Sequence, residues 1–257
     1  MFTKAIVKRP CKNLVNGLTT ANLGKPDYDL ALKQHQRYIE ALIECGLEVT
    51  ILEADEDYPD SVFVEDTAVL TPRCAIITNP GAPSRRGEII EISKVLKNIY
   101  QNVETITEPG TLEAGDVMMV GNHFYIGISK RTNQAGANQL INILEKYDLT
   151  GSTITLENVL HLKSGVSYLD NNNLLSIKNF INEPEFQKYN IILVDEDESY
   201  AANSLWINDN VLVPEGFPKT KENINNAGYT AIEIDVTEFR KLDGGLSCLS
   251  LRVYNQL

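Results

Sequence analysis

Residues Val117–Leu156, VMMVGNHFYIGISKRTNQAGANQLINILEKYDLTGSTITL, contain the pattern that decides the fold. Two apolar runs, Val117–Val120 and Phe124–Ile128, flank a Gly-Asn-His turn, which predicts a β-hairpin. Apolar residues then recur at helical spacing through Arg131–Tyr147, and Thr153–Leu156 is typical of another strand. The stretch therefore predicts a strand–strand–helix–strand unit.

Three less regular copies of this pattern occur elsewhere in the chain. Their predicted hairpins and closing strands are Thr67–Leu70, Ala75–Thr78 and Val103–Ile106; Val166–Leu169, Leu174–Ile177 and Ile191–Val194; and Leu205–Ile207, Val211–Val213 and Ala231–Ile234. Helical segments are predicted before the closing strands at Arg86–Tyr100, Pro184–Tyr189 and Thr220–Ala227. A unit that recurs in this way indicates a repeat architecture.

A fifth unit can be completed across the two ends of the chain. We expect Leu249–Val253 to pair with Ala5–Val7. A helix at Tyr28–Cys45 then leads to a strand at Glu48–Leu52. Five such units predict a closed α/β ring without exposed sheet edges, formed by residues 1–257 as a single domain. An ordinary mixed α/β sheet with several hairpins is the alternative.

Composition and charge narrow the class of protein. The formal net charge is −12, which disfavours binding to nucleic-acid phosphates or anionic membranes. No run approaches the roughly 18 apolar residues of a membrane helix, and we see no secretory signal. The four cysteines form no C-x-x-C pair, which argues against a zinc ribbon or a redox motif. We therefore expect a cytoplasmic protein that binds neither nucleic acid nor membranes.

Three carboxylates are crowded into Pro59–Asp66, PDSVFVED, before a predicted strand. Asp60, Glu65 and Asp66 form either a cation-binding cluster or a group of solvated surface carboxylates. Neighbouring residues of a strand point to opposite faces. Glu65 and Asp66 can therefore serve one site only if the strand has ended or bulged there.

Another carboxylate, Glu113, lies in Leu112–Val117, LEAGDV, at the entrance to a predicted strand. Carboxylates are natural acceptors for the planar guanidinium group with its many donors. Turn formation by Gly115 and Asp116 accounts for the segment equally well when it is taken alone.

A histidine and a cysteine complete the set of reactive side chains. His161 lies between two leucines, so it is either a buried core histidine or a general acid and base. Cys248 follows Gly244 and Gly245 at the start of a predicted strand. Two glycines there can expose a thiol close to the backbone, whereas a buried structural thiol is the alternative.

These four segments, taken together and in this order, resemble the dimethylarginine dimethylaminohydrolases. PGAPSRR at Pro80–Arg86, SKRTNQ at Ser129–Gln134, HLKS at His161–Ser164 and the helix around Gln34-His35-Gln36 also look like that family. The resemblance covers essentially the whole chain. It implies the pentein fold, a five-bladed ring of ββαβ units, which agrees with the repeat.

The resemblance implies a role for each candidate residue. Cys248 matches the family's nucleophile and His161 its acid and base. Glu113 and Asp66 match the carboxylates that bind the guanidinium. The remaining matches are substrate contacts: Asp60 and Glu65 at the amino end or guanidinium rim, Arg85 and Arg131 at the α-carboxylate, Leu18 in a lid loop, and the Leu242 carbonyl in the pocket wall.

The implied reaction is hydrolysis of an N-omega-methylated arginine to citrulline and methylamine or dimethylamine. Cys248 attacks the guanidinium carbon, and His161 protonates the departing amine and then activates water. We expect no metal or organic cofactor. A homodimer is compatible with the sequence.

Three other functions are also compatible with this resemblance. An arginine deiminase releases ammonia from unmethylated arginine, but such chains commonly carry an inserted helical domain that is not evident here. An amidinotransferase needs an acceptor that the sequence does not reveal. A non-catalytic arginine-binding module would not need the thiol of Cys248.

Overall fold

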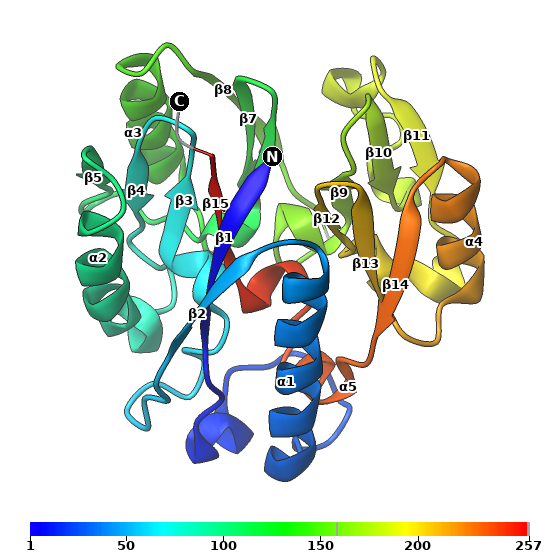
Figure 1. The fold of residues 1–257 in the computed structure, drawn as a ribbon. Coiled ribbons are helices and arrows are strands. Elements are labelled where there is room, and N and C mark those ends of the chain that lie inside the picture. Colours follow the sequence, from blue (N-terminus) through cyan, green and yellow to red (C-terminus); the bar gives the residue numbers. More distant parts are fainter. Residues whose placement is uncertain (158, 256–257) are drawn as a thin grey trace.

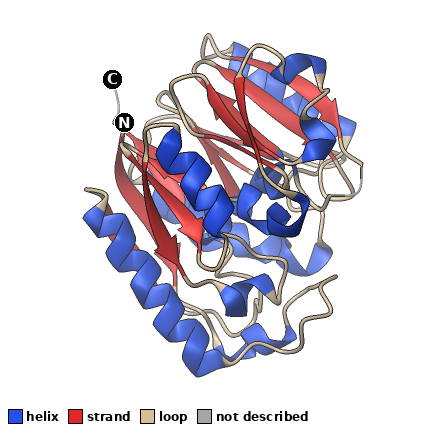
Figure 2. Cartoon of the chain, turned by 90° about the vertical axis from the view of Figure 1, so that its right-hand side faces the viewer, coloured by secondary structure: helices blue, strands red, loops and turns tan. Residues whose placement is uncertain are grey.

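The computed structural model describes residues 1–157 and 159–255, and it confirms the ring of five units (Figure 1). Each unit contains a three-stranded sheet in which the first two strands are antiparallel and the third is parallel to the second. The helices lie along the outside of the strands (Figure 2). The strands therefore form an inner layer and the helices an outer one.

Four of the units follow one another along the chain. The first comprises β3 (Ala68–Leu70), β4 (Ala75–Ile77), α2 (Ile89–Lys97) and β5 (Val103–Thr105). The second comprises β6 (Val117–Val120), β7 (His123–Ile128), α3 (Gln134–Glu145) and β8 (Thr150–Thr155). The third contains β9 (Val166–Tyr168), β10 (Asn173–Ser176) and β11 (Asn190–Leu193). The fourth comprises β12 (Leu205–Ile207), β13 (Asn210–Pro214), α4 (Pro218–Asn226) and β14 (Thr230–Ile234), and the short helix α5 (Thr237–Arg240) follows it.

The second unit shows how the sequence produces this arrangement. The turn between β6 and β7 places Gly121 at a φ of 59°, a conformation that favours glycine. The Asn133 side chain accepts a hydrogen bond from the N–H of Gly136 at 2.8 Å and so caps α3. The apolar face of α3, which includes Leu140 and Leu144, is then buried in one cluster with the sheet.

The fifth unit closes the ring through the two ends of the chain, as predicted. Strand β15 (Leu251–Tyr254) is antiparallel to β1 (Phe2–Lys8). After α1 (Tyr28–Glu44), strand β2 (Glu48–Leu52) is parallel to β1. The Asn208 side chain accepts a hydrogen bond from the N–H of Phe2 at 2.9 Å, which fixes the first strand beside the fourth unit.

Two predicted elements differ in the structure. The segment Pro184–Tyr189 does not form an α-helix; the chain between β10 and β11 instead contains the 3-10 turns Lys178–Phe180 and Pro184–Phe186. Pro184 is at the first position of its turn, where proline is tolerated, so the shortness of this connection is the reason that remains. The last strand begins at Leu251 rather than Leu249, because Ser247–Leu249 form a 3-10 turn.

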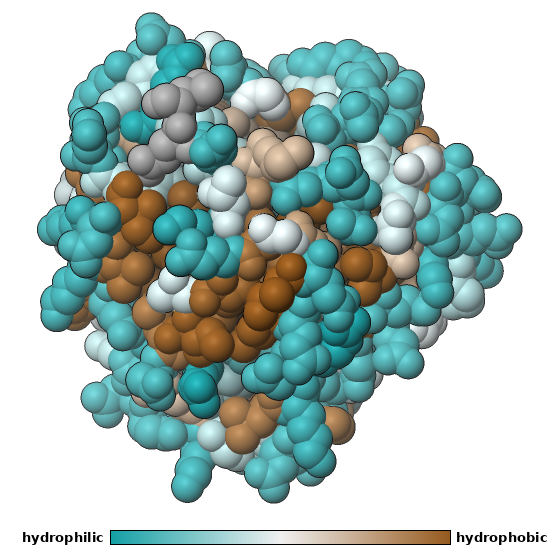
Figure 3. Space-filling model, viewed as in Figure 1, coloured by the Kyte–Doolittle hydropathy of each residue, from teal (hydrophilic) through white to brown (hydrophobic). Residues whose placement is uncertain are grey.

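Apolar surface is exposed around β2 on the face shown in Figure 3. The five sheets are separate, so the expectation that the ring removes sheet edges is wrong, and β2 is an edge strand. Ile51 of β2 is exposed, as is Ile43 of α1. Among the described residues, no helix is both long and apolar enough to span a membrane.

Candidate active site

A 3-10 turn lies directly before each of the inner strands β3, β6, β9, β12 and β15. These turns are Val64–Thr67, Ala114–Asp116, Leu162–Ser164, Glu196–Ala202 and Ser247–Leu249. The turns contact one another in series, so they gather at one end of the ring. The repeat itself therefore brings five distant parts of the chain to one place.

The candidate catalytic residues lie on or beside these turns. Asp66 belongs to the first turn, and Cys248 belongs to the last. Glu113 and His161 are the residues that immediately precede the turns before β6 and β9. Each of these residues lies at the same end of its own repeat unit. For this reason residues more than 180 apart in the sequence surround a single cavity.

This cavity has a volume of about 150 Å3. Nine of the ten site residues predicted from the sequence line it: Leu18, Asp60, Asp66, Arg85, Glu113, Arg131, His161, Leu242 and Cys248. The tenth, Glu65, lines a smaller hollow beside Cys248 and His161 instead. The functional roles of all ten remain predictions, whereas the structure fixes their positions.

His161 and Glu113 form a buried pair. Nε2 of His161 lies 2.9 Å from Oε2 of Glu113, whose other oxygen accepts hydrogen bonds from Arg131 Nη1 and the N–H of Ala82. Burial alone lowers the pKa of His161, but the charges of Asp66, Asp116 and Glu113 outweigh it and raise the pKa to about 9. His161 is therefore an imidazolium at neutral pH and can donate a proton.

The pKa of Glu113 shifts in the opposite direction. Burial raises the pKa of this carboxyl, but the hydrogen bond and charge of His161, and the charges of Arg85 and Arg131, lower it further than burial raises it. Glu113 is therefore ionised and can accept hydrogen bonds from a cationic ligand.

Asp66 is a second buried carboxylate in the cavity. Its Oδ2 accepts a hydrogen bond from Arg85 Nη1 at 2.5 Å, and its Oδ1 accepts one from the N–H of Gly115 at 2.9 Å. Asp66 thus lies on the same side of its turn as the cavity. The 3-10 turn provides the interruption of the strand that the sequence required.

Arg85 is held more tightly than the sequence suggested. Its Nε lies 3.1 Å from both oxygens of Glu88, and its Nη2 donates to the carbonyl groups of Asp60 and Phe63. Most donors of this guanidinium are therefore engaged within the protein. Sequence reasoning missed Glu88, although it lies three residues from Arg85.

Cys248 lies in the turn before β15, and its side chain is half-buried. The N–H of Gly245 points to Sγ at 3.4 Å. Burial raises the pKa of this thiol to about 12, with further increases from Glu65 and Asp66. The thiol is therefore neutral in the unliganded protein.

Both glycines before Cys248 are required by close packing. A Cβ at Gly244 would lie 2.2 Å from a ring carbon of Phe63, and a Cβ at Gly245 would lie 2.4 Å from Oδ1 of Asn203. The other three cysteines, Cys11, Cys45 and Cys74, are buried and free, in agreement with a structural role.

The segment around Leu18 covers the cavity. The N–H of Leu18 donates to Oδ1 of Asp60 at 2.9 Å. Thr20 donates through its N–H and its hydroxyl to Oδ2 of Asp243, at 2.5 and 2.9 Å. Asp243, which no motif singled out, thus holds this loop against the cavity wall.

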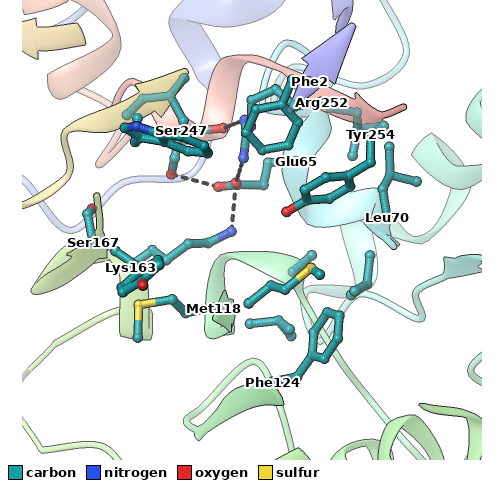
Figure 4. Close-up of a pocket in the computed structure, with 18 of the residues that line it drawn as sticks. Phe2, Glu65, Leu70, Met118, Phe124, Lys163, Ser167, Ser247, Arg252 and Tyr254 are labelled. Atoms are coloured by element: carbon teal, nitrogen blue, oxygen red, sulfur yellow. Dashed lines mark hydrogen bonds and ion pairs between the residues drawn. The ribbon is translucent and has the colours of Figure 1, made fainter. Parts of the chain in front are cut away.

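Glu65 occupies the centre of a buried ionic cluster instead of the cavity (Figure 4). Its Oε1 accepts hydrogen bonds from Lys163 Nζ and Arg252 Nη2, each at 2.6 Å, and its Oε2 accepts one from Ser247 Oγ at 2.7 Å. Asn203 joins the same cluster, since it bonds both Ser247 and the carbonyl of Lys163.

This cluster connects the three parts of the candidate active site. Glu65 precedes Asp66, Ser247 precedes Cys248, and Lys163 lies two residues after His161. We therefore regard the cluster as support for the geometry of the site. For Lys163 and Ser247, closeness in sequence to a candidate residue was the available signal.

Asp66, Glu113 and His161 also place ligand atoms within 4.8 Å of one another, a set that could hold a metal ion. The two carboxylates, however, already bind the guanidinium groups of Arg85 and Arg131. His161 is protonated at neutral pH and has no lone pair to offer a metal ion, whereas the two carboxylates can accept hydrogen bonds from a planar cationic group.

Comparisons with known proteins agree with this geometry. The model of a family described as "N,N dimethylarginine dimethylhydrolase, eukaryotic" matches residues 23–179. The chain is 56% identical over 253 residues to the N(G),N(G)-dimethylarginine dimethylaminohydrolase of Pseudomonas aeruginosa, covering 98% of this chain and 100% of the relative. The protein of the same name from Streptomyces coelicolor is 36% identical over 252 residues, with coverage of 97% and 96%.

Solved structures show the same relationship. A cysteine-to-serine variant of the Pseudomonas aeruginosa enzyme in complex with citrulline matches with a TM-score of 0.97 and 55% identity, covering 98% of this chain and 99% of that chain. The N-terminal domain of ArgZ, an arginine dihydrolase, matches with a TM-score of 0.89 at 20% identity and 98% coverage of both chains, which shows a shared fold. On the sequence identity and the family match together, the chain belongs to the dimethylarginine dimethylaminohydrolase family.

Proposed function

We infer that the protein hydrolyses N-omega-methylated arginine, either the monomethyl or the asymmetric dimethyl form, to citrulline and the corresponding amine. The observation that carries this inference is one cavity that holds a thiol, a protonated imidazole and two buried carboxylates. The names of the relatives at 56% and 36% identity support it, as does the citrulline complex of the Pseudomonas aeruginosa enzyme.

Substrate recognition follows from the charges of the cavity. Glu113 and Asp66 accept the donors of the planar guanidinium. Arg131, whose side chain is partly exposed, is suited to the α-carboxylate. Arg85 is buried against Asp66 and Glu88, so it contributes chiefly by orienting Asp66 unless the substrate displaces these bonds.

Asp60 is the carboxylate suited to the α-ammonium group of the substrate. It is buried in the cavity wall and accepts a hydrogen bond from the loop at Leu18. The contact of Asp60 with Leu18 is to a neutral N–H group. An α-ammonium group would add a positively charged partner for this carboxylate. The Leu242 carbonyl is a further candidate acceptor.

The ionisation of Cys248 depends on the substrate. Part of the elevated pKa of the thiol comes from the negative charge of Asp66. A guanidinium bound to Asp66 offsets this charge, so binding lowers the pKa of Cys248 and the proton leaves to solvent. The thiolate then adds to the guanidinium carbon.

His161 completes both halves of the reaction. Because Nε2 is held by Glu113, Nδ1 is the nitrogen available to transfer a proton to the departing amine. The C–N bond breaks and a cationic thiouronium remains on Cys248. Neutral His161 then takes a proton from water, whose oxygen adds to the same carbon. The C–S bond breaks, the thiol is restored, and citrulline leaves.

A small hollow beside the thiol provides room for methyl groups. It has a volume of about 50 Å3 and shares His161, Asp243 and Cys248 with the main cavity. Gly115 and Tyr200 form other parts of its wall, and the Glu65 cluster closes its far side through Glu65, Lys163, Asn203 and Ser247. One substituted guanidinium nitrogen directed toward this hollow would be accommodated. This space favours a methylated substrate over free arginine.

A substrate panel with citrulline detection tests the function. We expect turnover of monomethylarginine and asymmetric dimethylarginine, a lower kcat/KM for arginine, and loss of citrulline release in Cys248→Ser. A clear preference for arginine would instead support the deiminase reaction. Full activity of Cys248→Ser would rule out the proposed nucleophile.

The wider setting of the enzyme is also a proposal. We propose that residues 1–257 act as a single catalytic domain in the cytoplasm, without a cofactor or a nucleic-acid partner. The acidic net charge supports the last point. A homodimer could use the apolar surface around β2, and light scattering of the purified protein tests that arrangement.

A further inference from the structure

A second cavity, here called the rear cavity, is lined at one end by Glu65, Lys163, Ser247 and Arg252 of the ionic cluster (Figure 4). Its volume is about 330 Å3, compared with about 150 Å3 for the candidate active site. This is within the range of roughly 300–1,000 Å3 that is typical of small-molecule pockets. Its walls are largely apolar and include Phe2, Leu70, Met118, Phe124, Trp206 and Tyr254.

The inner end of the rear cavity carries an excess of positive charge. Lys163 and Arg252 both line it, and both bind Oε1 of the single carboxylate of Glu65. Two cations and one anion leave a formal charge of +1 at this end. The ammonium of Lys163 has three donors, and its hydrogen bond to a described residue goes to Glu65.

An unbalanced cation that faces apolar walls is electrostatically unfavourable unless water or an anion compensates it. An anionic group in hydrogen-bonding range of Lys163 would balance the charge without displacing Glu65. An apolar tail on the same molecule would cover the partly exposed side chains of Met119, Trp206 and Tyr254 and gain from their burial. The excess positive charge and the apolar walls together favour a ligand with one anionic group and an apolar tail.

We propose that the rear cavity binds a small monocarboxylate with an apolar tail. The carboxylate contacts Lys163 and the tail extends toward Phe2, Trp206 and Tyr254. Asp170 and the N-terminal ammonium of Met1 are the remaining charged groups of the lining, and both residues also line a neighbouring hollow. Their opposite charges leave the excess of positive charge at the Lys163 end.

The lining of the rear cavity omits Cys248, His161 and Glu113, but it shares Glu65, Lys163 and Ser247 with the small hollow beside Cys248. Binding can therefore be measured without turnover, and the test does not depend on the assignment of the substrate.

Trp206 provides a direct probe, because it lines the rear cavity and the chain contains one tryptophan. We would titrate the protein with octanoate and, separately, with octan-1-ol while following tryptophan fluorescence. We expect saturable binding of octanoate and at least about tenfold weaker binding of the alcohol, a difference of about 1.4 kcal/mol. Citrulline, added to fill the active site, should leave the octanoate titration unchanged.

Matched variants test the contribution of the cation. Lys163→Met should reduce the affinity for octanoate to that for octan-1-ol, whereas Lys163→Arg should retain the preference for the acid. Ser167→Leu, which adds an apolar side chain within the rear cavity and leaves the ionic cluster intact, should weaken both ligands. This variant keeps the test valid if Lys163→Met does not fold.

Three results would overturn the proposal. The first is the absence of a saturable fluorescence change, which would indicate that water alone fills the rear cavity. The second is equal affinity for the acid and the alcohol. The third is displacement of octanoate by citrulline, which would place the acid in the active site.

Discussion

Nε2 of His161 lies 2.9 Å from Oε2 of Glu113, and the side chains of both residues are buried. The pair fixes the ring orientation of the histidine and favours its protonated form. The charge of Glu113 helps to keep His161 protonated, and the charge of His161 helps to keep Glu113 ionised. Both the stability of the protein and its activity should therefore depend on the pH at which His161 loses its proton.

The stability of the protein should decrease as pH rises through the pKa of His161. This pKa is raised from 6.5 to about 9, so the protonated histidine contributes its full stabilisation below pH 6.5 and loses it as pH passes about 9. We expect the free energy of unfolding of wild type, relative to His161→Gln, to fall by at most about 3 kcal/mol over this interval. Urea unfolding at several pH values measures the difference, and a pH-independent difference would contradict the assignment.

Replacing Glu113 by glutamine should lower the pKa of His161, because one of the charges that raise it is lost. The histidine would then be less protonated at neutral pH, and kcat/KM should fall by about 100-fold or more. NMR titration of the imidazole measures the pKa independently of activity. Glu108→Gln, at an exposed carboxylate, is the control and should change neither property.

Two variants of the Glu65 cluster should shift the pKa of Cys248 in opposite directions. The charge of Glu65 raises the pKa of this thiol and that of Lys163 lowers it. Glu65→Gln should therefore lower the pKa, and Lys163→Met should raise it further. The pH dependence of thiol alkylation measures both. Shifts of the same sign would show that local rearrangement, rather than charge, controls the thiol.

Glu65→Gln should also reduce turnover and stability. It leaves Lys163 and Arg252 without their shared carboxylate, and breaking a buried ion pair typically costs about 3–5 kcal/mol. Glutamine can still accept the hydrogen bond from Ser247, so part of the support for Cys248 is retained. A larger loss of activity in Glu65→Ala than in Glu65→Gln would demonstrate this positioning role.

The hairpins and the closure of the ring could be predicted because they depend on local patterns. Turn residues between short apolar runs recur in the four consecutive units, and β15 pairs with β1 as expected. The 3-10 turns before the inner strands could not be predicted, since segments of three to seven residues are too short to show a periodicity of their own. Ser247–Leu249, for example, look like the beginning of a strand in the sequence.

The same turns explain what could be predicted of the site. Motifs identified Asp66, but neighbouring residues in a 3-10 turn differ in direction by about 120°, so Glu65 faces the ionic cluster instead. Asn203 gave no local signal, because its role depends on contacts with residues 40 and 44 positions away. Such tertiary partners become visible only once the ring is closed.

A methyl group at Gly115 should disrupt the site more than it disrupts the fold. A Cβ there would lie 2.8 Å from Oδ1 of Asp66 and 2.9 Å from Nδ1 of His161. Gly115→Ala therefore forces these two side chains away from residue 115. It also crowds the hydrogen bond that the N–H of residue 115 donates to Oδ1 of Asp66. Displacement of reacting groups by about 1 Å can reduce the rate by about 100-fold, whereas overpacking costs about 1–3 kcal/mol of stability.

Gly151→Ala is the matched control for this variant. Its Cβ would meet Cγ1 of Ile141 at 3.1 Å, a contact with a flexible apolar side chain outside the active site. We expect Gly151→Ala to retain activity even if its Tm falls slightly. Gly115→Ala should lose activity at a temperature where circular dichroism shows it to be folded. Similar activity in the two variants would mean that Asp66 and His161 can move apart without consequence, which contradicts their proposed roles.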